Sequence, residues 1–219
     1  TSSWPQRLSW STTSTFKQWF VAEENFQATQ YCEQVIDRPA HHLNPVLIVA
    51  EPQAGCSHVL HATGQAMLRR QEGHVLFITA ADAAGTDALE ASWQNALPGA
   101  TALVIDDLHE FANHETWGHQ LGVLVDHALN HGVQVVAGGR LAVDGFPPSR
   151  LKEVFRSSLE VRLESPQPPT LMAFARWRCA QRNLLVSDRH LAQLSRMQPY
   201  GWRMVETRLE QLALAFENG

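Results

Sequence analysis

A turn between an apolar run and a helix-compatible segment has the residue spacing of a phosphate-binding loop. From Ala50 to Ser57 the chain reads AEPQAGCS, which lies on the frame G-x-x-x-x-G-K-[ST]. Gly55 keeps the second glycine, whereas Ala50 stands at the first glycine position and Cys56 at the lysine position. Such loops hold phosphates because glycines let backbone N–H groups close around them while the lysine neutralises charge. Since Cys56 is uncharged and Glu51 adds a negative charge, we predict a nucleotide-binding scaffold with impaired or lost nucleotide chemistry.

Two carboxylates and one arginine could complete such a site. Asp106 and Asp107 end an apolar run, where phosphoryl-transfer proteins place acids that hold Mg²⁺ and position water. Two acids at a strand end could also simply face solvent, but the loop upstream favours an inherited site. Arg203, at the start of the last helix, could reach a nucleotide or remain a solvated helix-end arginine. The predicted inherited nucleotide site is Gly55, Cys56, Ser57, Asp106, Asp107 and Arg203.

Other chemistries receive less support from the residue pattern. A Ser–His–Asp hydrolase would use Ser57, His58 or His61, and Asp106, but the chain lacks the G-x-S-x-G turn. Cys56 could be a catalytic thiol, because a helix N-terminus lowers a thiol's pKa. The histidine pairs lack a nearby third ligand, so we expect no metal site.

Hydrophobic runs and turn residues predict the elements that position these groups. Short apolar runs alternate with helix-compatible segments, which is typical of a parallel α/β sheet with right-handed crossovers. Beyond three prolines in residues 165–169 the pattern changes to helices only. The predicted strands are 46–50, 74–79, 101–107, 133–137 and 159–163. The predicted helices reach from near 25 to 36, then span 57–70, 86–96, 108–130 with a break near Asn113, 149–155, 170–181, 187–196 and 201–217.

These elements predict three parts in the chain. Residues 1–14 form an N-terminal arm, residues 15–165 the α/β domain, and residues 166–219 a small helical domain. Within the arm, Gln6-Arg7-Leu8-Ser9-Trp10 is an amphipathic peptide that either docks on a partner or belongs to a tail whose tryptophans pack on their own domain.

Composition excludes several functional classes. The 219 residues carry a net charge of −5, which argues against a general nucleic-acid binder. There is no run of 18 apolar residues, so we expect no membrane span, and the start of the chain lacks the pattern of a signal peptide. Three widely spaced cysteines suggest a reducing, cytoplasmic setting.

Taken together, these segments resemble the DnaA/Hda-like AAA+ family of bacterial replication proteins over about residues 15–217. The resemblance implies a P-loop AAA+ fold, with a three-layer parallel α/β sheet and a small C-terminal helical lid. It rests on the aromatic-rich opening from Thr15-Phe16 to Asn25, on HVLHA at 58–62 after the loop, on LVIDDL at 103–108, and on the helix that begins at Trp202-Arg203.

The resemblance also assigns positions in this chain to family roles. It makes Cys56 the replacement of the phosphate-loop lysine, Ser57 the magnesium-side hydroxyl, Asp106 and Asp107 the Walker B acids, 137–140 the sensor 1 region and Arg203 the sensor 2 arginine. Val154 falls where the family has its arginine finger, with Arg156 two positions away. Relatives of similar length carry a sliding-clamp peptide near the start, of which residues 6–10 are a loose echo.

Two hypotheses follow from these departures. The first is a non-hydrolysing adaptor or regulator in DNA replication, which we expect not to be an enzyme and to have no cofactor. Its partner would be a protein, either a DnaA-type AAA+ protein or a sliding clamp, or a second copy of the chain. The alternative is a switch that binds ADP or ATP with Mg²⁺ and keeps weak ATPase activity. A nucleic-acid-binding module, the third hypothesis, is disfavoured by the acidic charge balance.

Overall fold

The computed structural model describes residues 5–83, 93–199 and 201–217, which divide into two compact units. The first unit contains the chain up to Ala50 and then Cys56–Leu163. The second contains Glu51–Gly55 and the chain from Glu164 onward. The boundary expected at 165/166 thus lies two residues beyond the observed one, and the loop after the first long strand belongs with the helical unit.

A six-stranded sheet forms the centre of the first unit. Its order is β1-β3-β4-β5-β2-β6, and every pairing from β3 to β6 is parallel. The apolar runs therefore form buried parallel strands, as predicted, because both faces of such a sheet are covered. The strands are β1 (Gln6–Arg7), β2 (Val46–Ala50), β3 (His74–Ile78), β4 (Ala100–Ile105), β5 (Gln134–Gly139) and β6 (Leu159–Leu163).

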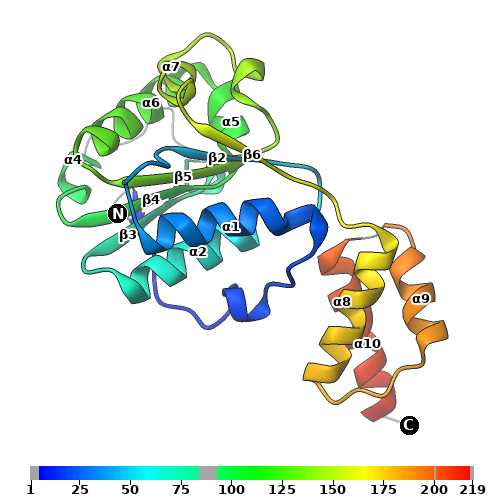
Figure 1. Ribbon diagram of the computed structural model, residues 1–219. Helices are drawn as coiled ribbons and strands as arrows, with labels where there is room; N and C mark the ends of the chain where they lie inside the picture. The colour runs from blue at the N-terminus through cyan, green and yellow to red at the C-terminus, as the bar shows by residue number, and fades with distance from the viewer. Residues whose placement is uncertain (1–4, 84–92, 200, 218–219) are drawn as a thin grey trace. The chain divides into compact units, whose positions relative to one another are not determined.

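Helices cover both faces of this sheet and give three layers. Helices α1 and α2 pack on one face, and α5, α6 and α7 on the other (Figure 1). The predicted break near Asn113 is confirmed, since α5 ends there and α6 begins two residues later. The helices of this unit are η1 (Phe16–Gln18), α1 (Glu23–Asp37), α2 (Cys56–Arg70), α3 (Ala80–Ala83), α4 (Trp93–Ala96), α5 (Leu108–Asn113), α6 (Glu115–Asn130), η2 (Val143–Gly145) and α7 (Arg150–Phe155).

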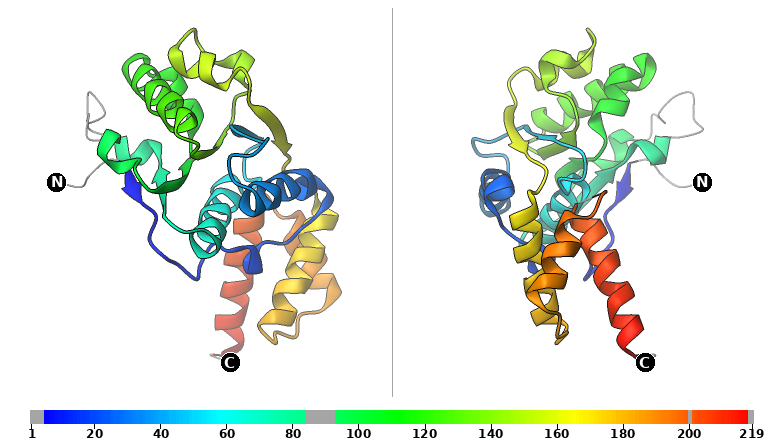
Figure 2. Two further views of the ribbon diagram at one scale, coloured as in Figure 1. Left: turned by 60° about the vertical axis from the view of Figure 1, so that its left-hand side comes forward. Right: turned by 90° about the vertical axis from the view of Figure 1, so that its right-hand side faces the viewer.

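Two elements of the first unit differ from the sequence prediction. The helix α3 was not predicted, and of the helix predicted over 86–96 only α4 falls within the described residues. The other difference is β1, which adds an antiparallel strand to the edge of the sheet (Figure 2). Gln6 pairs with Phe77, and the Leu8 N–H donates to the Val75 carbonyl at 2.8 Å. The arm therefore satisfies backbone groups of a strand edge that would otherwise be open.

Three helices build the second unit: α8 (Pro168–Gln181), α9 (Asp188–Arg196) and α10 (Trp202–Glu217). The Ser187 side chain caps α9 by accepting from the His190 N–H, which confirms the predicted helix start. Arg178 of α8 and Arg182, the residue that follows α8, form ion pairs with Glu206 of α10, so that the two helices are joined by charge as well as by apolar packing. No helix in the described part of the chain is long and apolar enough to span a membrane.

Candidate functional site

The residues predicted for phosphate chemistry are divided between the two units. Cys56 and Ser57 begin α2, and Asp106 and Asp107 follow β4, so all four lie in the first unit. In a parallel sheet the carboxyl ends of neighbouring strands form one edge, where ligands of α/β proteins bind. Gly55 and Arg203 belong to the second unit, and each half is therefore described by itself.

Asp106 is the most enclosed acid of the first half. Asp106 is only 5% exposed. Its carboxylate accepts hydrogen bonds from the Ser57 hydroxyl and from the Asp107 N–H, the latter at 2.9 Å. Burial raises the pKa of the Asp106 carboxyl, the Ser57 hydrogen bond opposes this shift, and the Asp107 charge adds to it. The structure thus brings together Ser57 and Asp106, two of the predicted site residues.

Asp107 lies at the turn into α5. Its backbone adopts the left-handed region at φ 53°, which directs the chain from the strand end into the helix. The residue is half-buried, unlike its neighbour. The two acids thus have distinct environments, and Asp106 is the one bonded to the helix α2.

The Cys56 thiol packs against the backbone of β5. A Cβ added to Gly138 would collide with the Cys56 Sγ, and it would lie 2.8 Å from the Leu60 Cδ1. Burial raises the pKa of the Cys56 thiol, and the nearby charges of Asp106 and Asp107 raise it further. The suggestion that the helix N-terminus lowers this pKa was therefore wrong, because desolvation and like charge outweigh the helix dipole. The thiol stays neutral and is a poor nucleophile.

The histidines near Ser57 do not form a catalytic relay with it. The His61 ring stacks on Phe77 with centroids 4.0 Å apart, and burial lowers its pKa. A His58 ring nitrogen lies 3.3 Å from the Thr15 carbonyl oxygen. Because the Ser57 hydroxyl bonds Asp106 itself, the order serine, histidine, acid that a hydrolase needs is not built here.

The loop 51–55 is bound to the helical unit through its own polar groups. The Glu51 carboxylate accepts from the Ser165 N–H at 2.9 Å, and the Trp202 indole N–H donates to the Ala54 carbonyl at 3.1 Å. Gly55 has φ 98°, a conformation that side chains other than glycine rarely adopt. The negative charge of Glu51 is thereby held in place on the loop.

Arg203 is exposed on the first turn of α10. Within the described residues of the helical unit, its side chain forms no ion pair, whereas the buried Arg208 one turn later donates to four backbone carbonyls. Sequence reasoning singled out the former and missed the structural role of the latter. It also missed Trp202 as the anchor of the loop, since 148 residues separate it from Ala54 and no local pattern signals the pairing.

The sheet order, the loop between β2 and α2, the acids after β4 and the three-helix unit together define a P-loop AAA+ module. The profile of the bacterial DnaA ATPase domain matches residues 10–165. The chain belongs to that family.

The chain is also similar to individual DnaA proteins and to solved DnaA structures. The chain is 26% identical over 188 residues to the chromosomal replication initiator protein DnaA of Psychromonas ingrahamii. The aligned region covers 80% of this chain but only 40% of that protein. Domain III of DnaA from Thermotoga maritima superposes with a TM-score of 0.82 at 19% identity, covering 96% of this chain and 92% of that one. AMPPCP-bound DnaA from Aquifex aeolicus gives 0.80 at 18% identity, covering 93% and 66%. At these identities the solved structures show the shared fold.

Proposed function

We propose that this chain is a non-hydrolysing adaptor or regulator in DNA replication that acts through contacts with a protein partner. The observation that carries the proposal is the neutral Cys56 thiol, which packs against Gly138 at the position of the phosphate-loop lysine. Phosphate groups need positive charge there, whereas this site presents the carboxylates of Asp106 and Asp107 to an uncharged side chain. One lost charge-assisted contact costs about 1.5–3 kcal/mol.

Further departures act in the same direction. Glu51 places a fixed carboxylate on the phosphate loop itself. Val154, at the position where the family resemblance puts an arginine finger, is a core residue that is 8% exposed. A buried valine cannot offer charge to a neighbouring subunit's phosphate. These departures replace charged catalytic groups while the chain keeps the DnaA fold, which supports a protein-binding role.

The partner class that we propose is a DnaA-type AAA+ protein. The arm residues 6–10, the loose echo of a clamp peptide, start as strand β1 of the protein's own sheet, so a clamp would have to compete with β3 for them. An AAA+ partner instead would use the surfaces on which such modules assemble. Arg156, two positions after Val154, is exposed at the end of α7.

The test is complex formation without nucleotide. Purified chain and the DnaA protein of the same organism are mixed and followed by light scattering and ATP turnover. The proposal predicts a complex in nucleotide-free buffer, a change in the partner's ATP turnover, and no turnover by this chain alone. The proposal fails if this chain alone hydrolyses ATP and the Ser57→Ala substitution abolishes that turnover, because Ser57 would then take part in phosphate transfer.

A second function is favoured by one specific observation. The Ser57 hydroxyl and the Asp106 carboxylate are paired, and together they are the oxygen groups that would hold Mg²⁺ beside a nucleotide. A relative with the same fold binds AMPPCP. The alternative is thus a switch that binds Mg-ADP or Mg-ATP weakly, and it predicts that complex formation with the partner changes when nucleotide is added.

A further inference from the structure

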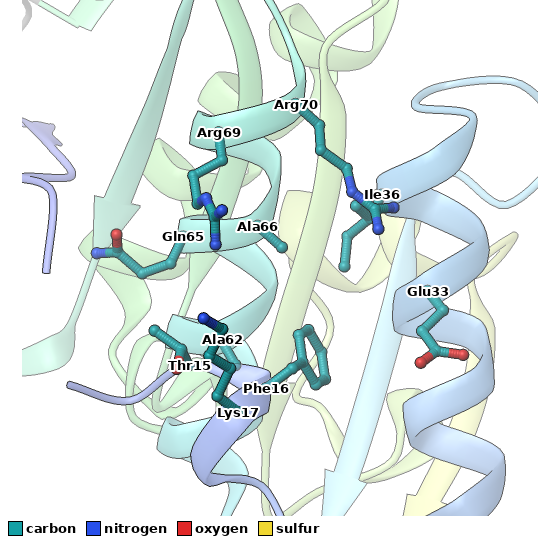
Figure 3. Close-up of a pocket in the computed structure, with 10 residues that line it drawn as sticks. All are labelled: Thr15, Phe16, Lys17, Glu33, Ile36, Ala62, Gln65, Ala66, Arg69 and Arg70. Carbon is teal, nitrogen blue, oxygen red and sulfur yellow. The ribbon is translucent and has the colours of Figure 1, made fainter. Parts of the chain in front are cut away.

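A cavity of about 310 Å³ opens between η1, α1 and α2, within the first unit (Figure 3). None of the predicted phosphate-site residues lines it. It lies beside the turns of α2 from Ala62 onward, well after the helix start at Cys56. Its volume is at the lower end of that of small-molecule sites. The lining residues are Thr15, Phe16, Lys17, Glu33, Ile36, Ala62, Gln65, Ala66, Arg69 and Arg70.

Positive charge dominates the lining of this cavity. Three cations and one carboxylate line it, although the whole chain carries −5. Arg70 is already paired with Asp37. Lys17 and Arg69 point toward one another from η1 and α2 (Figure 3), and neither forms an ion pair within the described part of the chain. Two like charges on one rim repel each other, and an anion placed between them would relieve that repulsion.

Apolar side chains form part of the remaining lining, beside the polar Thr15 and Gln65. Phe16 of η1 and Ala66 of α2 are half-buried (Figure 3), whereas Ile36 and Ala62 are almost completely covered. An anion that is entirely polar would leave Phe16 and Ala66 in contact with water. The combination fits a ligand that has one anionic end and one apolar or aromatic body.

The arm keeps this side of α2 in a fixed arrangement. The buried Gln65 donates to the Ser9 carbonyl at 2.8 Å and accepts from the Ser11 N–H at 3.1 Å. The Arg69 guanidinium lies 5.5 Å from the centre of the Trp10 ring, a distance at which cation and ring attract. Arg69 is thus oriented by its neighbours before any ligand arrives, which reduces the entropy lost on binding.

We propose that this cavity binds a small organic phosphate, with the phosphate between Lys17 and Arg69 and the organic group on Phe16 and Ala66. Phosphate suits the pair because both a lysine ammonium and an arginine guanidinium form charge-assisted hydrogen bonds with its oxygens. The site is independent of the loop 51–55 and of the function proposed above. It would allow a phosphorylated metabolite to act on the arm and α2 of this protein.

The experiment is a titration of the isotope-labelled chain with phenyl phosphate, followed by amide chemical shifts. Phenyl phosphate has no purine, so a nucleotide site does not capture it through a base. The expected result is saturable shifts in residues 15–17 and 62–70 with a Kd of about 1 mM or tighter. Inorganic phosphate has only the anionic group and phenol only the aromatic group. Each should bind roughly tenfold more weakly than phenyl phosphate.

Charge variants separate this site from nonspecific attraction. Lys17→Gln and Arg69→Gln should each weaken phenyl phosphate binding about tenfold, the effect of one charge-assisted contact. Glu33→Gln removes the only lining carboxylate and should tighten binding about twofold. Arg189→Gln, at an exposed arginine of α9, is the matched control and should change nothing. Thermal melting of each variant shows that it is folded.

Any of the following outcomes would overturn the proposal. One is the absence of localised shifts at about 10 mM phenyl phosphate. The other is binding that the Lys17 and Arg69 variants leave unchanged, or that Arg189→Gln weakens equally. A single-stranded oligonucleotide that shifts these residues when phenyl phosphate does not would likewise exclude a small-molecule site.

Discussion

The neutral thiol of Cys56 differs chemically from the lysine that the phosphate-loop frame has at this position. Burial and the Asp106 and Asp107 carboxylates all disfavour a thiolate at this position. Because the pKa of the thiol is raised, a smaller fraction of it is ionised at any given pH than in a peptide. The site therefore offers neither a cation for phosphate nor a nucleophile for covalent chemistry.

Alkylation tests this at single-residue resolution. With iodoacetamide near pH 8.5, Cys56 in the folded chain should react at least about tenfold more slowly than in the unfolded chain, because thiolate is the reactive form. Peptide mass spectrometry reports each cysteine separately, and Cys179, whose pKa is also raised by burial, serves as an internal comparison. A Cys56 rate that rises to its plateau below pH 9 would show a lowered pKa and contradict the geometry.

Asp106 gives a stability prediction with a definite sign. Its folded pKa is raised, so its favourable contribution is present below the unfolded pKa and is lost as pH rises through the folded pKa. Asp106→Asn removes the destabilisation that ionisation of this carboxyl causes. The asparagine amide oxygen can still accept a hydrogen bond from the Ser57 hydroxyl. We expect a Tm increase of about 2–4 °C at pH 7, corresponding to about 1 kcal/mol in a chain of this size, and none at pH 4.

Differential scanning fluorimetry at both pH values is sufficient for this comparison. The control is Asp144→Asn, at an exposed acid of η2. An equal Tm change at pH 4 and pH 7 would mean that ionisation of Asp106 has no part in the effect.

At the scale of elements, the arm is an integral strand of the first unit. A Cβ added to Gly64 in α2 would lie 2.7 Å from the Leu8 Cδ2, and its other nearest neighbours are at ordinary contact distances. Alanine is favoured over glycine within a helix by about 0.8–1.0 kcal/mol. The arm alone therefore decides whether alanine at position 64 stabilises the protein.

A double-mutant cycle makes this quantitative. Gly64→Ala should stabilise the Leu8→Ala protein by about 0.8–1.0 kcal/mol, and that gain should be largely lost when Leu8 is present. Urea unfolding of the four proteins gives the coupling, which we expect to exceed about 0.5 kcal/mol. If the two substitutions were simply additive, Leu8 would not pack on α2 in solution.

In the helical unit, Arg208 closes the end of α9. Its guanidinium donates to the carbonyls of Leu194, Met197, Gln198 and Pro199, and the residue is only 9% exposed. Arg208→Met keeps much of the side-chain volume but leaves these carbonyls without their donor. The free energy of opening this unit should fall by about 2–3 kcal/mol.

Hydrogen exchange measures that opening directly. Amides of α9 should exchange faster in Arg208→Met, while those of β4 and β5 keep their protection because they belong to the other unit. Arg189→Met, at an exposed arginine on α9, provides the matched control. Equal exchange in both variants would show that the four carbonyl contacts contribute nothing to the unit's stability.

At the scale of the whole molecule, the sequence predicted what depends on local pattern. Buried runs such as 101–105 can only be central strands, and Gly55 with Ser57 indicates the turn into a helix, so the sheet and the Ser57–Asp106 pair followed. Strand β1 could not be predicted, because two residues are too few to show an alternating hydrophobic pattern and their pairing depends on a free edge of β3. The Trp202–Ala54 contact joins distant segments, and the thiol pKa depends on burial that a helix-terminus argument ignores.

The central claim is that this AAA+ module no longer uses nucleotide, and the most direct test is calorimetric titration with ADP and with ATP plus Mg²⁺. We predict no binding by the natural chain up to about 1 mM nucleotide. Cys56→Lys restores the missing cation and should bring binding into the measurable range, because a charge-assisted phosphate contact is worth about a tenfold gain or more. Binding of either nucleotide by the natural chain at micromolar concentration would contradict the account and establish the nucleotide-dependent switch instead.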